Sequence, residues 1–223
     1  MNFDHAFIIT YGRSGSTLLQ GILNTIPGAD IRGENGNLLF FIYRMYEALK
    51  IGKRYAPVAD ETTHPWYGAG QIPHDDYHEG MLALFRRDIL MPGGNGRLTG
   101  FKEIRFDNIG YPLLSGYVAY LRDFFPRCAV IFNTRELDAV IESNRRAKHF
   151  VSADKIRQAD INFRRLAKEH PGFCHLTQYD DYNGRPEALR GLFQFLGAPF
   201  DAARIAETMS QTHSVRTSSL SLS

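Results

Sequence analysis

The chain has 223 residues, enough for one globular domain with a sizeable core. Hydrophobic residues make up 43% and charged residues 22%, and these ordinary values exclude disordered and fibrous classes. Lysine and arginine number 26 against 24 acidic residues, a near balance that gives no reason to expect nucleic acid as a partner. No apolar run approaches the roughly 20 residues of a membrane span, and the first residues lack a secretory pattern.

The two cysteines, Cys128 and Cys174, lie in apolar, strand-like runs. Small thiols in such runs are usually core residues, so we expect both to be reduced and buried. Together with the absence of a secretory pattern, this predicts a cytoplasmic location.

The chain opens with an apolar strand at 6–11, a tight polar loop at 12–16 and a helix at 17–26. The helix is indicated by Leu18, Leu19, Ile22 and Leu23 at helical spacing. Later elements of the first half follow in chain order: a strand at 29–31, a helix at 37–50 and a helix at about 76–91.

Strands and helices continue to alternate in the second half. The expected strands are 98–104, 128–134 and 173–178, and the expected helices are 111–125, 136–148, 153–169 and 186–196. Repeated alternation favours an α/β fold with a mainly parallel sheet flanked by helices. We expect a single domain over residues 1–223, with a polar tail at about 213–223.

The sharpest motif joins the first strand to the first helix. It reads Tyr-Gly-Arg-Ser-Gly-Ser-Thr at positions 11–17. Glycines let backbone N–H groups turn toward one anion, and the helix start adds a positive dipole end. The phosphate-binding candidates are Gly12, Arg13, Ser14, Gly15, Ser16 and Thr17.

This loop differs from the nucleoside-triphosphate pattern G-x-x-x-x-G-K-[ST]. Gly15 stands before Ser16 where that pattern has lysine, and the strand at 128–134 is followed by Arg135 where a magnesium-binding acid is expected. A kinase needs both features. The sequence therefore disfavours a small-molecule kinase.

The loop resembles that of the sulfotransferases that use 3′-phosphoadenosine 5′-phosphosulfate (PAPS), in the form common in bacterial and Golgi-type members. A second family element is a strand ending in arginine and a serine about eight positions later, here Arg135 and Ser143. The resemblance implies a P-loop-like sulfotransferase fold, and it implies that Arg135 and Ser143 bind the 3′-phosphate. A forked arginine and a serine hydroxyl suit that group. Residues 176–197 resemble the late strand and helix of the family more weakly, and we expect this segment to have a mainly structural role.

Sulfuryl transfer needs a base for the acceptor proton and donors for the leaving oxygen. By resemblance to the glutamate-base members, Glu34 is the candidate base, because it follows the short strand at 29–31. Lys102 and Arg13 are the candidate donors to the leaving phosphate, and Arg105 is a candidate for that role or for acceptor binding. Cytosolic members have a catalytic histidine where this chain has Ile104, which favours Glu34. Glu103 is the second candidate acid.

Prolines and glycines at 52–74 indicate a lid-like loop. His64, Trp66 and Tyr67 lie in it and are candidates for acceptor binding, because aromatic rings stack on sugars and flat molecules. The nearby histidines and acids lack the rigid spacing of metal ligands, so we expect no metal. In the polar tail, Arg216 is a candidate for closing over the adenosine, as C-terminal loops do in the family.

The predicted function is sulfuryl transfer from PAPS to a hydroxyl or amine, leaving adenosine 3′,5′-bisphosphate (PAP). The acceptor is expected to be a carbohydrate, a glycolipid or a small metabolite. Two alternatives stay open at this point, a small-molecule kinase and a non-catalytic nucleotide-binding module. The oligomeric state does not follow from the sequence.

Overall fold

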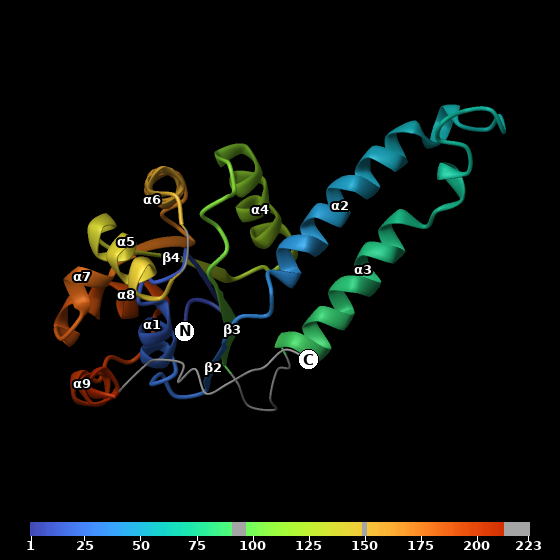
Figure 1. Ribbon diagram of the computed structural model, residues 1–223. Helices are drawn as coiled ribbons and strands as arrows, with labels where there is room; N and C mark the ends of the chain where they lie inside the picture. Colours follow the sequence, from blue (N-terminus) through green and yellow to red (C-terminus); the bar gives the residue numbers. More distant parts are fainter. Residues whose placement is uncertain (91–96, 149–150, 212–223) are drawn as a thin grey trace, which may run out of the picture.

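The computed structural model describes residues 1–90, 97–148 and 151–211. Within them, five strands form one sheet in the order β2-β3-β1-β4-β5, and every neighbouring pair is parallel. The strands are β1 (His5–Ile9), β2 (Ala29–Arg32), β3 (Leu98–Glu103), β4 (Cys128–Thr134) and β5 (Cys174–Gln178). This confirms the predicted parallel α/β fold (Figure 1).

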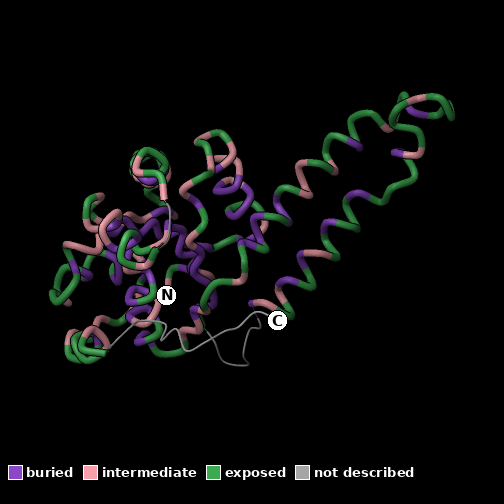
Figure 2. Tube along the Cα trace, in the orientation of Figure 1, coloured by how far each residue is buried: buried purple, intermediate pink, exposed green. Residues whose placement is uncertain are grey.

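Alternate residues of the strands belong to two separate hydrophobic cores, because successive side chains of a strand point to opposite faces of the sheet. On β1, Phe7 and Ile9 join one core, while Ala6 and Ile8 join the other. The first core packs against α4 (Tyr111–Phe124), α6 (Ala153–Glu169) and the start of α2 (Leu38–Tyr55). The second packs against α1 (Ser16–Leu23), α8 (Arg190–Leu196) and α9 (Ala202–Ser210). The sheet is therefore covered on both faces (Figure 2).

The strand order puts a topological switch point at the carboxyl ends of β1 and β4, and we call this place the crevice. The chain leaves β1 toward β2 at one edge of the sheet and leaves β4 toward β5 at the other. Adjacent strands whose connections diverge form a switch point, where open α/β sheets bind their ligands. The loop at 12–15 follows β1, and Arg135 with α5 (Leu137–Arg146) follows β4. Both sequence motifs thus flank the same crevice.

A helical hairpin projects from this body (Figure 1). It consists of α2, two short 3-10 helices at Ala56–Val58 and Ala69–Gln71, and α3 (His74–Leu84), which continues as a π-helical segment at Phe85–Leu90. The root of α2 packs on α4 through Phe40 and Tyr43, whose rings lie 5.2 and 5.6 Å from that of Tyr117. The outer part of the hairpin is mostly exposed (Figure 2).

Several boundaries differ from the sequence-based expectation. Helix α2 extends past residue 50 to Tyr55, so the expected loop at 52–74 begins later and contains the two 3-10 helices. The helix expected at 186–196 is divided into Pro186–Leu189 and α8, and α7 (Tyr179–Tyr182) and α9 were not anticipated. The expected tail at 213–223 lies outside the described residues, so the single-domain organisation stays a prediction.

Candidate active site

The loop after β1 presents the start of α1 toward the crevice. Arg13 and Gly15 both have left-handed backbones, with φ of 66° and 81°. Gly15 is the N-cap of α1, and no side chain caps the helix there. An uncapped helix start offers N–H groups and a positive dipole end to an anion. A Cβ on Gly15 would collide with the Tyr179 ring, which explains the glycine.

A buried polar cluster holds this loop in place. The Thr10 hydroxyl donates to the carbonyl of Asn133 over 2.5 Å, and its oxygen lies within hydrogen-bonding distance of Ser14 Oγ, at 2.8 Å. Asn133 Nδ2 donates to the Ser14 carbonyl over 2.9 Å, and its Oδ1 accepts from the hydroxyls of Thr177 and Tyr182 at 2.9 and 3.0 Å. Ser14 is fully buried, so its side chain fixes the loop rather than facing a ligand.

Arg13, Arg135 and Ser143 meet at the mouth of the crevice, as the sequence motifs predicted. Arg13 Nε donates to Ser143 Oγ over 2.9 Å, and Arg135 Nη1 donates to the Arg13 carbonyl over 3.1 Å. Within the described residues neither arginine forms an ion pair with a carboxylate. Two uncompensated guanidinium groups and a hydroxyl in one place suit a multiply charged anion.

Two tyrosines orient Arg135, and the sequence analysis missed both. The Tyr11 hydroxyl donates to the Arg135 carbonyl over 3.2 Å and accepts from its backbone N–H over 3.0 Å. The Arg135 guanidinium lies 4.7 Å from the centroid of the Tyr179 ring. Of the five guanidinium N–H groups of Arg135, only one on Nη1 has an acceptor among the described residues, and Nε is buried without a partner. Burial raises the pKa of Tyr11 to about 12, which keeps its hydroxyl a proton donor.

Glu34 and Lys102 form an ion pair on the β3 side of the loop. Lys102 Nζ lies 2.5 Å from Glu34 Oε1, and the exposed fractions of the two side chains are 6% and 37%. A buried ammonium needs a negative partner, so Lys102 draws Glu34 inward. Because Ile8 of β1 pairs with Lys102, this ion pair lies beside the strand that leads into the phosphate loop.

Glu103, the second candidate acid, is only 1% exposed. Its Oε1 accepts from the Asn35 backbone N–H over 2.6 Å, and its Oε2 is buried without a partner. Burial raises the pKa of this carboxyl, opposed by the backbone N–H groups of Asn35 and Asn37. Lys102 therefore fixes the side chain of Glu34, while Glu103 fixes the backbone that follows it.

The remaining candidates are scattered. Ser16 is buried, and Gly12 and Thr17 lie on the loop and the first turn of α1. Arg105 is exposed and its backbone pairs with Tyr11, so it lies beside the loop. His64, Trp66 and Tyr67 instead lie at the tip of the hairpin, where Trp66 stacks on Tyr55 at 5.0 Å. The 18 residues of α2, about 27 Å, separate them from Glu34. Arg216 lies outside the described residues.

Cys128 and Cys174 are buried free thiols, as expected. Burial raises the pKa of Cys128 to about 12, so it stays protonated. No group of metal-ligating side chains and no helix able to cross a membrane occurs among the described residues.

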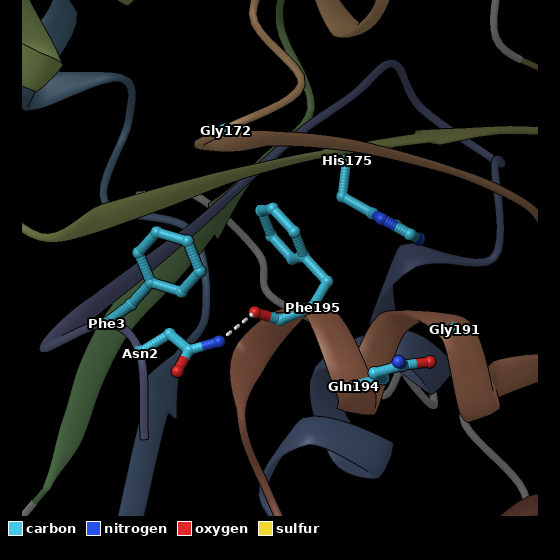
Figure 3. Close-up of a pocket in the computed structure, with 7 residues that line it drawn as sticks. All are labelled: Asn2, Phe3, Gly172, His175, Gly191, Gln194 and Phe195. Atoms are coloured by element: carbon cyan, nitrogen blue, oxygen red, sulfur yellow. Dashed lines mark hydrogen bonds between the residues drawn. The ribbon is translucent and has the colours of Figure 1, made fainter.

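A shallow hollow of about 590 Å³ lies elsewhere (Figure 3). Asn2 and Phe3 precede β1 and His175 is near the start of β5, so the hollow opens at the amino ends of the strands, away from the crevice. Its lining residues include no lysine, arginine or acid, and burial lowers the pKa of His175. It shares no residue with the site described above. The lining residues are Asn2, Phe3, Gly172, His175, Gly191, Gln194 and Phe195.

Replacement of Asn133 by alanine should destabilise the chain strongly. The Ser14 carbonyl and the Tyr182 hydroxyl would lose this hydrogen-bond partner, and Thr177 would keep only its longer bond to the Phe132 carbonyl. Each unsatisfied buried group costs about 1–3 kcal/mol. We expect Asn133→Ala to lower the free energy of unfolding by about 3–5 kcal/mol in a urea titration followed by circular dichroism. Asn183→Ala, which removes an exposed amide, is the matched control. A loss below about 1 kcal/mol would show that the cluster does not support the loop.

Glu103→Gln should change how stability depends on pH. The folded chain binds the Glu103 proton more tightly than the unfolded chain, because burial raises the pKa above its usual 4.5. The contribution of Glu103 to the stability of the wild type is therefore complete below pH 4.5, and it is lost as the pH rises through the pKa of the folded chain. A glutamine at this position can still accept the hydrogen bond from the Asn35 backbone N–H, and it does not ionise. The variant should therefore become more stable relative to the wild type as the pH rises from 4.5 to 7. Glu207→Gln, an exposed control, should follow the wild type; equal pH profiles for all three chains would contradict the assignment.

Comparison with known proteins agrees with this geometry. The sequence pattern of the sulfotransferase family matches residues 6–202. The sulfotransferase domain of the olefin synthase from Synechococcus PCC 7002 has a similar structure, with a TM-score of 0.60 and 20% sequence identity. The match covers 93% of this chain and 78% of that domain, which shows a shared fold. No curated protein matches the chain. Since the family pattern spans most of the sequence, from the first strand to α9, the chain belongs to the sulfotransferase family.

Proposed function

We propose that this chain transfers a sulfuryl group from PAPS to a hydroxyl or amine of its acceptor, with Glu34 as the base. The observation that carries the proposal is the crevice between β1 and β4. It gathers an uncapped helix start, Arg13, Arg135 and Ser143 on one side of the loop and the Glu34–Lys102 pair on the other. Groups suited to anion binding and a carboxylate suited to proton transfer thus lie on the two sides of one loop.

The residues present fit the two charged ends of PAPS. The backbone of residues 12–17 and the start of α1 would hold the 5′-phosphosulfate, as helix starts hold phosphate groups. Arg135 and Ser143 would hold the 3′-phosphate. Support comes from the unpartnered Nε of Arg135 and from the contact that links Ser143 to Arg13. Arg13 lies between the two positions and would neutralise charge on the leaving phosphate.

Glu34 would take the proton of the acceptor hydroxyl. The acceptor oxygen then forms a bond to sulfur, the bond from sulfur to the bridging oxygen breaks, and the electron pair stays on the phosphate of PAP. Lys102 would hold the Glu34 side chain in place before transfer. Once Glu34 is protonated their ion pair weakens, so the Lys102 ammonium becomes available to the leaving oxygen. In this scheme Arg13 and Lys102 assist the step that Glu34 begins.

The acceptor is proposed to be a carbohydrate, a glycolipid or a small metabolite. Exposed Arg105 lies beside the loop and would contact an acceptor or its anionic group. Contacts from His64, Trp66 and Tyr67 would require an acceptor long enough to reach the tip of the hairpin. The cytoplasmic location stays a prediction.

The two alternatives are not favoured. A kinase would place lysine before Ser16 and an acid after β4, where this chain has Gly15 and Arg135. A binding module would not need a carboxylate held by a buried lysine beside the phosphate loop.

PAP should stabilise the chain far more than ATP with magnesium, because only PAP has a 3′-phosphate for Arg135 and Ser143. At about 100 times its dissociation constant, PAP would add about 2.7 kcal/mol and raise the melting temperature by roughly 5–10 °C. Arg135→Ala should weaken PAP binding more than tenfold in calorimetry, since charge-assisted contacts contribute about 1.5–3 kcal/mol.

Arg122→Ala serves as the control for that experiment. Arg122 is exposed near the end of α4, which leads into the amino end of β4, whereas the proposed site lies at the carboxyl ends of the strands. Its removal should leave PAP binding unchanged. Equal stabilisation by PAP and by ATP with magnesium would argue against a 3′-phosphate site.

Glu34→Gln should separate catalysis from binding. The amide oxygen can still accept from Lys102, so PAP binding should stay close to that of the wild type. Turnover should fall by about 10²–10⁴-fold, the usual contribution of a general base. Turnover is measured as PAP released from PAPS in the presence of candidate acceptors, with Glu61→Gln at the hairpin tip as control. Undiminished turnover would exclude Glu34 as the base, and a parallel loss of PAP binding would make its role structural.

A further inference from the structure

Exposed hydrophobic side chains gather on the hairpin. Of the eleven large hydrophobic residues that are exposed in the described part of the chain, ten lie between residues 38 and 84, and the other is Ile161 on α6. The hairpin residues with the most exposed side chains include Val58 at 66%, Phe41 at 61% and Tyr77 at 54%. Such a concentration on one projecting element is typical of an interaction surface.

The exposed residues of α2 follow a heptad pattern. Successive intervals of three, four, three and four residues join Phe41, Arg44, Ala48, Ile51 and Tyr55, and all five are exposed. This 3.5-residue period is the spacing by which one helix packs against another. Four of the five are apolar and all five are exposed, although Tyr55 also stacks on Trp66 of the hairpin tip. We call this row the α2 seam.

Helix α3 carries a shorter row of the same kind. Tyr77, Gly80 and Leu84 are all exposed and stand three and four residues apart; they form the α3 seam. Gly52 of α2 packs on His74 of α3, which defines the sides by which the helices face each other. Each residue of an α-helix turns by 100° about the helix axis. On both helices the seam therefore lies roughly a quarter turn from the contact side, and the direction of this turn about the helix axis is the same for both. Because the two helices are antiparallel, both seams open on one side of the hairpin.

The charges of the hairpin divide between its two halves. From Arg44 to Arg54, α2 has four basic residues and one acid, whereas residues 55–79 have five acids and no lysine or arginine. Arg54 and Asp76, next to the two seams, form no ion pair in the part of the chain that the structure describes. An acidic tip would be repelled by an anionic membrane surface. A surface with both signs side by side is instead complementary to itself.

We propose that this face of the hairpin pairs with the same face of a second copy of the chain. A twofold axis along the hairpin places α2 of each copy against α3 of the other, so the basic outer end of α2 meets the acidic start of α3 and the four helices form a bundle. A twofold axis across the hairpin would instead place α2 of one copy against α2 of the other, and the basic residues of the two helices would repel each other. The face is about 27 Å long and about 20 Å wide, a footprint of roughly 540 Å² per copy; the two copies together just exceed the ~1,000 Å² that a specific interface needs.

Sedimentation equilibrium of the full chain between about 1 and 100 µM tests the proposal. The wild type should have twice the monomer mass at the upper concentrations. Ile51→Glu and Tyr77→Glu should each raise the dimer dissociation constant by roughly a hundredfold or more, because every dimer would then bury two unpaired charges. Both residues are exposed in the single chain, so circular dichroism should show unchanged folding.

Ile161→Glu is the matched control, since it places the same charge on the other exposed hydrophobic residue and should leave the dimer intact. A wild type that stays monomeric at about 100 µM overturns the proposal, whatever else the hairpin binds. So does a dimer that survives both seam variants.

Charge reversal tests the direction of the axis. Arg54→Glu alone should weaken the dimer, and the double variant Arg54→Glu with Asp76→Arg should restore it, because the two signs are exchanged across the interface. A double variant no tighter than the single one overturns the pairing of α2 with α3.

Discussion

Asn133 makes three hydrogen bonds from one buried side chain, and each ends on a different element: the loop after β1, strand β5 and helix α7. A buried amide is stable only when its groups are paired, so these three elements must keep one relative position. That position brings the Tyr179 ring against Gly15 and beneath Arg135. The geometry of the proposed anion site therefore depends on a buried amide that is engaged with the protein itself.

The same arrangement explains how two guanidinium groups can lie together without acids. Arg135 donates to the carbonyl of Arg13 and rests on an aromatic ring, and Arg13 donates to Ser143. Each contact offsets part of the repulsion while leaving the positive charge uncompensated. The charge is consequently oriented before a ligand arrives, and oriented charge is the main way in which enzymes stabilise a transition state.

The sheet, its parallel direction and the meeting of two motifs could be predicted, because alternating strands and helices confine such motifs to the carboxyl edge. The buried hydrogen bonds that support the site could not be predicted. Asn133 reads as an ordinary polar residue at the end of an apolar strand, and its partners lie 44 to 119 positions away. The hairpin could be predicted only in part: prolines and glycines indicated a loop at 52–74, but the helix before them extends to Tyr55 and projects from the body. The role of that loop as a lid stays a prediction.

Lys102 and Glu103 show how a strand end can hold a loop from two directions. Neighbouring strand residues point to opposite faces, yet both reach the segment at 34–37, one through the side chain of Glu34 and one through the backbone of Asn35. Both are almost fully buried, so removal of Glu34 would leave Lys102 as an uncompensated charge close to Glu103. The three residues therefore form one electrostatic unit, and the effects of replacing them singly should not add. A carboxylate held in this way cannot be moved without disturbing the strand that leads into the proposed site.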